Sequence, residues 1–74
     1  MRRPAVKLRQ LLGANVRKAR LELGWSQEKL CAEAQLSQSY LSQVESGLRS
    51  VSIDSIDQLS RALLVTPDSL LKQS

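Results

Sequence analysis

Residues 26–47 read SQEKLCAEAQLSQSYLSQVESG, and this stretch contains two short helical patterns separated by a tight turn. Ser26 and Ser37 each precede one pattern, where a serine hydroxyl can accept a hydrogen bond from an amide of the first helical turn. Gly47 marks the end of the second pattern. The spacing therefore predicts a helix from about Gln27, a turn of about three residues, and a second helix over about 37–45.

Small and apolar residues at helical spacing would close a core between these two helices. Cys31 supplies the small side chain required where the helices cross, and the apolar positions are Leu30, Ala34, Leu36, Leu41 and Val44. This spacing is that of a helix-turn-helix, whose second helix enters the major groove of DNA. A simple helical hairpin would show the same apolar positions.

The outward face of the second helix separates these two interpretations. At about 100° per residue, one side carries short, neutral hydrogen-bonding groups, at Gln38, Ser39, Ser42, Gln43 and Ser46. The other side carries Tyr40, Leu41 and Val44. A solvent-facing helix usually carries charges, whereas glutamine amides suit the edge of adenine and serine hydroxyls adapt to several bases. This pattern favours insertion into the major groove.

Glu45 falls on the apolar side of this projection and not on the neutral side. We expect Arg20, late in the preceding helical stretch, to pair with it across the core. Removing one partner of a buried ion pair typically costs about 3–5 kcal/mol. A surface acid at this position would instead contribute almost nothing.

Further helical patterns flank residues 26–47. Apolar residues recur at intervals of three and four from Leu8 to Leu23. Ser52 or Asp54 can begin a fourth helix, whose inward residues are expected to be Ile53, Ile56, Leu59, Ala62 and Leu63. No segment alternates with the period of a strand.

The segment Thr66-Pro67-Asp68 predicts a fifth helix, because proline suits the first helical position and an acid suits the positive end of a helix. The sequence thus predicts an all-α fold, a compact five-helix domain over 8–74. Residues 1–7 are expected to form a basic arm in which Pro4 discourages helix.

The chain has 74 residues and a formal net charge of +4, which is typical of one small domain and favours a polyanionic partner. Its basic residues concentrate before the first acid, Glu22, at Arg2, Arg3, Lys7, Arg9, Arg17, Lys18 and Arg20. The arm would either reach DNA or stay disordered in the free protein.

The composition argues against most enzyme classes. With one cysteine and no histidine, no internal disulfide, His/Cys zinc site or Ser-His or Cys-His pair can form. We expect no catalytic residue, cofactor, metal or small-molecule ligand. No apolar run approaches the length that spans a bilayer, and no secretory signal is evident, so a cytoplasmic location is expected.

Roughly residues 11–71 resemble the Cro/phage-repressor (Xre-type) helix-turn-helix family, which has the lambda-repressor-like DNA-binding fold. The matching positions are Arg17, Arg20, Gly24, Ser26-Gln27, Leu30, Leu36-Ser37, Leu41-Ser42, Glu45, Gly47, Leu59, Ala62, Leu63 and Val65. The resemblance implies a sequence-specific regulator of transcription that binds operator DNA.

The same resemblance implies a role for each matching site residue. It places Gln38, Ser39, Ser42 and Gln43 against base edges in the major groove. It places Gln27, Tyr40, Ser46 and Arg49 against the phosphate backbone. It also implies that Arg20 and Glu45 form the internal ion pair of the family.

Four positions depart from the family pattern. Gln35 stands where the turn usually has glycine, so a positive φ there would cost about 1 kcal/mol. Cys31 replaces the usual alanine, Val51 replaces a common proline, and Leu64 replaces a common glycine. The stretch RSVSI, residues 49–53, looks like the controller proteins of restriction–modification systems, although phage regulators and toxin–antitoxin repressors share the same template.

One helix in one groove reads only a few base pairs, so useful specificity needs two subunits on two half-sites. We expect a homodimer whose interface includes Leu64, Val65, Leu70 and Leu71, unless these residues only cap the core. The alternative function is a protein-interaction module, such as an antitoxin-type partner-binding subunit with weak DNA binding.

Overall fold

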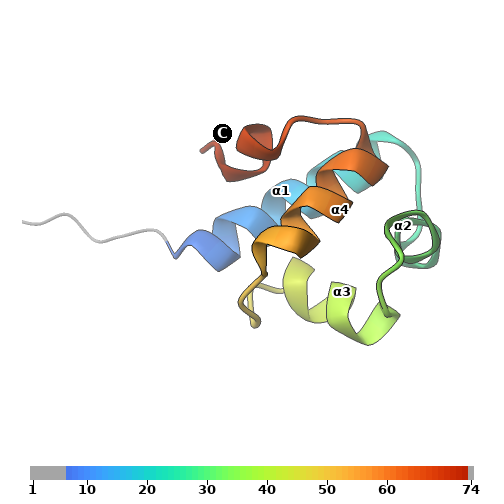
Figure 1. The fold of residues 1–74 in the computed structure, drawn as a ribbon, viewed down its shortest axis with the longest axis horizontal. Helices are drawn as coiled ribbons and strands as arrows, with labels where there is room; N and C mark the ends of the chain where they lie inside the picture. The colour runs from blue at the N-terminus through green and yellow to red at the C-terminus, as the bar shows by residue number, and fades with distance from the viewer. Residues whose placement is uncertain (1–6, 74) are drawn as a thin grey trace, which may run out of the picture.

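The computed structural model describes residues 7–73, which form four α-helices and a final 3₁₀ helix (Figure 1). The elements are α1 (Leu8–Glu22), α2 (Gln27–Ala34), α3 (Gln38–Glu45), α4 (Ile53–Leu63) and η1 (Pro67–Leu71). The all-α prediction is confirmed. Within the described range, no helix is long and apolar enough to cross a membrane. Most of the predicted basic arm, with Arg2 and Arg3, lies outside the described residues.

The prediction of five helices is wrong, because the described residues contain four α-helices and η1 is a short 3₁₀ turn. Its hydrogen bonds span three residues, since both the amide and the hydroxyl of Ser69 donate to the Thr66 carbonyl, at 3.1 and 2.6 Å. The backbone is extended again at Lys72. Short 3₁₀ turns are frequent in such segments, whereas long 3₁₀ helices are uncommon.

Serine side chains begin three of the helices: Ser26 and Ser37 as predicted, and Ser52 as one of the two predicted alternatives. The hydroxyl of Ser26 accepts from the amide of Lys29 at 3.0 Å. Ser37 and Ser52 cap α3 and α4 in the same way, each at 3.1 Å. Since each cap satisfies an amide that has no partner within its helix, it fixes the residue at which the helix begins.

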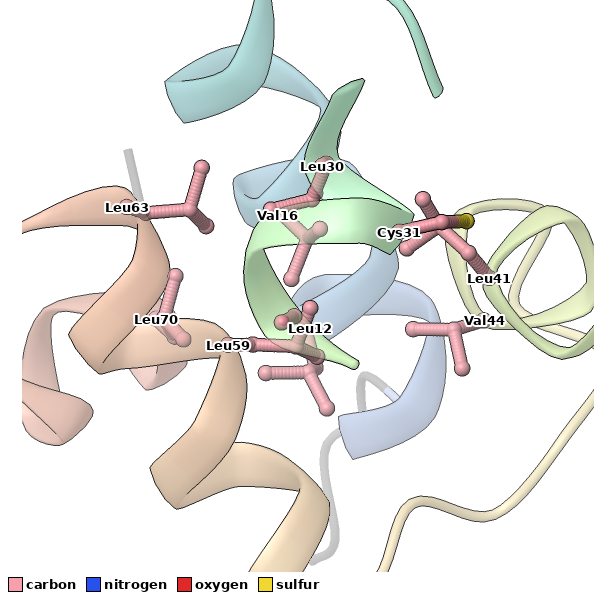
Figure 2. Packing of buried hydrophobic residues seen from close by; sticks show 10 residues of the cluster. Leu12, Val16, Leu30, Cys31, Leu41, Val44, Leu59, Leu63 and Leu70 are labelled. Carbon is pink, nitrogen blue, oxygen red and sulfur yellow. The ribbon is translucent and has the colours of Figure 1, made fainter. Parts of the chain in front are cut away.

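The core lies where all five elements meet. α1 packs against α3, α4 and η1, whereas α2 packs against α3 and α4. Figure 2 shows side chains from every element directed into this centre. The buried hydrophobic residues are Leu12, Val16, Leu30, Cys31, Ala34, Leu41, Val44, Leu59, Leu63 and Leu70.

The inward face of α4 differs from the prediction at its first residue. Ile53 is 84% exposed, because the buried stripe runs through Ser55, Leu59 and Leu63, and Ile53 lies about 200° around the helix from Ser55. Ser55, which the apolar pattern did not include, is therefore buried on this face, and Ile53 is not.

Two non-glycine residues end helices in the left-handed region. Gln35, at the end of α2, has φ 60°, so the conformation whose cost the sequence raised is present here without a glycine. Leu64, at the end of α4, has φ 61°. Each conformation carries a backbone strain of about 1–2 kcal/mol that glycine would avoid.

Gly13 allows α1 to approach the last turn of α3 closely. A Cβ atom at residue 13 would overlap the carbonyl oxygen of Val44 and would lie 3.0 Å from that of Glu45. Backbone atoms cannot move aside as a flexible side chain can. The absence of a side chain at this point therefore sets the separation between α1 and α3.

We expect Gly13→Ala to destabilise the fold by about 1–3 kcal/mol, the usual cost of overpacking. Better helix propensity at this position offsets part of that loss. Urea unfolding measures the change, with Ala14→Ser, at an exposed neighbouring position, as the control. A variant at least as stable as the original chain would contradict the close approach.

Candidate nucleic-acid interface

The exposed face of α3 is uncharged. Gln38, Ser39, Ser42 and Gln43, the predicted base-contacting residues, are all exposed. Leu41 and Val44 are completely buried and hold the opposite face of the helix against the core. In Figure 1, α3 lies at the lower edge of the domain, away from the C-terminal segment. The structure thus brings the four polar residues together on one accessible surface.

The turn between α2 and α3 sets the direction of this surface. With Gln35 in the left-handed conformation, the amide of Leu36 donates to the carbonyl of Cys31 at 3.0 Å. The side chain of Gln58, from α4, donates to the Ala34 carbonyl at 3.3 Å. These hydrogen bonds satisfy carbonyls at the end of α2, and Ser37 then begins α3 directly.

The structure brings Arg20 and Glu45 into a two-point contact. Nε of Arg20 lies 2.7 Å from Oε2 of Glu45, and Nη2 lies 2.9 Å from Oε1. The two side chains are only 9% and 3% exposed. Hydrogen bonding to Glu45 raises the pKa of Arg20, and burial opposes this effect only in part. The contact with Glu45 thus favours the charged form of the guanidinium.

Two further groups complete this buried cluster. Nη1 of Arg20 donates to the carbonyl of Trp25 at 2.8 Å. The amide of Gln27 donates to Oε1 of Glu45 at 3.1 Å. Sequence patterns gave no sign of the Trp25 contact, because a main-chain carbonyl leaves no signature in residue types. The cluster joins α1, the start of α2 and the end of α3.

The four predicted phosphate-contacting residues occupy different environments. Gln27 is half-buried, with its amide on Glu45. Tyr40 is half-buried at the edge of α3, and Ser46 is exposed, with its hydroxyl donating to the Ser42 carbonyl at 2.9 Å. Arg49 is exposed and touches α3 itself, since its Nη1 lies 2.9 Å from Oε1 of Gln43.

Three of the four predicted dimer residues reach the surface. Leu64 is 83% exposed, Leu71 is exposed and Val65 is half-buried. Leu70 is 2% exposed and belongs to the core, so its prediction as a surface residue is wrong. The spacing of leucines near the end of the chain does not distinguish a residue that closes the core from one that faces outward.

Two large apolar residues near α3 are exposed as well. Leu48, just after α3, is 75% exposed, and Ile53, at the start of α4, is 84% exposed. The exposure of Leu48 depends on the path of the α3–α4 connection. Both residues are available for contact with another molecule.

The fold and this surface define a helix-turn-helix domain, and comparison with known families agrees. The helix-turn-helix family matches residues 16–70, from the middle of α1 to η1. The chain belongs to the Xre-type helix-turn-helix family of DNA-binding transcriptional regulators.

Individual relatives include controller proteins. The chain is 46% identical over 65 residues to control protein C.BamHI of Bacillus amyloliquefaciens, covering 86% of this chain and 80% of that protein. The crystal structure of the restriction–modification controller protein C.AhdI of Aeromonas hydrophila superposes with a TM-score of 0.81 at 37% identity, covering 84% and 94% of the two chains. The hypothetical transcription factor NHTF from Neisseria superposes with a TM-score of 0.84 at 34% identity, covering 93% and 85%. The predicted resemblance is confirmed.

We expect Glu45→Ala to destabilise the domain by about 3–5 kcal/mol, because it leaves the buried Arg20 guanidinium without its partner. The double variant Arg20→Met with Glu45→Leu should recover much of this loss. Denaturant unfolding provides the measurement. Asp57→Ala, which breaks the exposed pair with Arg61, is the control and should cost less than about 1 kcal/mol. Equal losses in Glu45→Ala and Asp57→Ala would contradict the structural importance of the cluster.

Proposed function

We propose that this chain is a sequence-specific regulator of transcription that binds double-stranded operator DNA as a homodimer. In this proposal α3 enters the major groove and its exposed uncharged face reads base edges. The observation that carries the proposal is this neutral face on a chain whose formal net charge is +4.

In this proposal different residues supply the specificity for bases and the attraction to phosphate. The major groove, about 12 Å wide, admits one α-helix, and amides and hydroxyls can match its donors and acceptors. Basic residues outside α3 supply the attraction to phosphate, as Arg9, Arg17 and Lys18 are all exposed on α1. The one charged residue of α3, Glu45, is neutralised inside the protein and does not repel the backbone.

Phosphate contacts around α3 would fix its register in the groove. Gln27 stands at the start of α2, and Tyr40, Ser46 and Arg49 lie on or just after α3. Contacts of this kind orient a protein on the duplex without reading its sequence. The base contacts then fall to Gln38, Ser39, Ser42 and Gln43.

The names of the relatives suggest the biological setting. C.BamHI is a control protein and C.AhdI is a restriction–modification controller protein. We therefore propose that this chain controls transcription within a restriction–modification system.

The homodimer would join two half-sites about one helical turn apart. We propose that Leu48 and Ile53 carry the main contact, because they flank the connection that leaves the end of α3. Pairing across this connection keeps both α3 helices on one side of the dimer. Leu64, Val65 and Leu71 form the alternative surface, and Leu64 stands at the opposite end of α4.

Selection of duplexes from a random pool should enrich one symmetric sequence, and binding to it should fall steeply with added salt. The triple variant Gln38→Ala, Ser42→Ala, Gln43→Ala should lose at least about tenfold in preference for that sequence. Its binding to unrelated DNA should persist. Gln73→Ala, an exposed amide remote from α3, is the matched control.

An unchanged base preference in the triple variant would contradict the groove assignment. Binding of DNA without sequence preference, together with a tight complex with another protein, would instead support the partner-binding module.

We expect Ile53→Asp to convert the dimer to a monomer, whereas Leu64→Asp should leave it dimeric. Both residues are exposed, and an acid at the first position of α4 suits the helix dipole, so folding should persist. Sedimentation equilibrium measures the mass in solution. Dissociation by Leu64→Asp alone would place the interface at the far end of α4.

A further inference from the structure

Arg49 touches the recognition surface at two points, although it lies outside α3. Its Nη1 donates to Oε1 of Gln43 at 2.9 Å. Its guanidinium carbon also lies 5.1 Å from the centre of the Tyr40 ring. Tyr40 and Gln43 are three residues apart on α3 and therefore neighbours on its surface. The three side chains form one group, which we call the Arg49 cluster.

The chemistry of the guanidinium fixes the orientation of the Gln43 amide. Arginine has five N–H donors and no acceptor, so the Gln43 atom that faces it must be the oxygen. The nitrogen of the amide, with its two N–H donors, then points away from Arg49. An unconstrained glutamine would present its donor and its acceptor equally.

This orientation changes what Gln43 can read. Paired recognition of adenine uses the glutamine oxygen to accept from N6 and the glutamine nitrogen to donate to N7. In the Arg49 cluster one of the two lone pairs of the Gln43 oxygen accepts from Arg49. The adjacent positive charge disfavours the approach of the adenine N6 donor to the other lone pair. Guanine presents two acceptors, N7 and O6, in the same region of the groove.

We propose that Arg49 is a positioning residue that makes Gln43 a donor-only reader, so that the Arg49 cluster selects guanine over adenine. This inference rests on the proposed function and deepens it. The role differs from that of a phosphate contact, because the loss of a phosphate contact weakens binding to every sequence alike.

Tyr40 makes the arrangement specific for arginine. The planar guanidinium can stack on the half-buried ring while one edge reaches Gln43. Lysine would keep the positive charge, and with it the attraction to phosphate, but it lacks the plane and the fixed fork of donors. The variant Arg49→Lys therefore keeps the attraction to phosphate and removes the positioning of Gln43.

The test is selection of duplexes from a random pool by the original chain and by the variants Gln43→Ala, Arg49→Ala and Arg49→Lys. The original chain should enrich guanine at the base pair whose preference Gln43→Ala relaxes. At that pair, both Arg49 variants should lower the preference for guanine over adenine by about tenfold. Base pairs unaffected by Gln43→Ala should keep their preference, and Arg49→Lys should keep the salt dependence.

The alternative results are equally distinct. If Arg49→Ala weakens all sequences alike, or if the original chain enriches adenine at the Gln43 position, the positioning role is overturned. If the original chain enriches no sequence, the proposed function itself fails, and this inference fails with it.

A measurement without DNA tests the same contact. The ¹³C resonance of the Gln43 side-chain carbonyl should shift in Arg49→Ala and stay unchanged in Arg17→Ala, an exposed basic residue on α1. Circular dichroism confirms that each variant is folded. An unmoved carbonyl resonance in Arg49→Ala would overturn the hydrogen bond on which the inference is built.

Discussion

The buried contact between Arg20 and Glu45 holds the recognition helix in place. The carboxylate accepts three hydrogen bonds, two from Arg20 and one from Gln27, and the guanidinium also donates to the Trp25 carbonyl. Taking two charges out of water is costly, and only such complete pairing offsets that cost. Because the partners come from α1, α2, α3 and the α1–α2 connection, the angle of α3 is fixed relative to the rest of the domain.

The same contact determines the electrostatics of the surface. It withdraws the one charge of α3 into the interior and leaves amides and hydroxyls outside. Gly13 also helps to position α3, since it lets α1 lie directly against the carbonyls of Val44 and Glu45. A neutral recognition face is thus a product of what is buried behind it as much as of what is exposed.

Local features of the sequence predicted most of the fold. The serine caps, the turn at Gln35 and the neutral face of α3 depend on neighbours within a few residues, so residue types and spacing suffice. Ile53, Leu70 and η1 differ from prediction because their environments depend on distant packing. The main-chain carbonyl of Leu70, for example, accepts a hydrogen bond from the side chain of Asn15, which lies 55 residues earlier in the chain. The Arg49 cluster was equally invisible, because it depends on the path of the α3–α4 connection and no periodicity describes that path.

Gln35 and Leu64, the residues with left-handed backbone conformation at the ends of α2 and α4, are positions where a substitution could raise stability. Both side chains are exposed, and neither glutamine nor leucine favours the positive φ found at these positions. Glycine at the two positions would relieve strain worth about 1 kcal/mol each, after allowance for its greater freedom in the unfolded chain. For a domain of this size that corresponds to a melting temperature several degrees higher per site. The natural chain therefore sits below the thermostability that its own architecture permits.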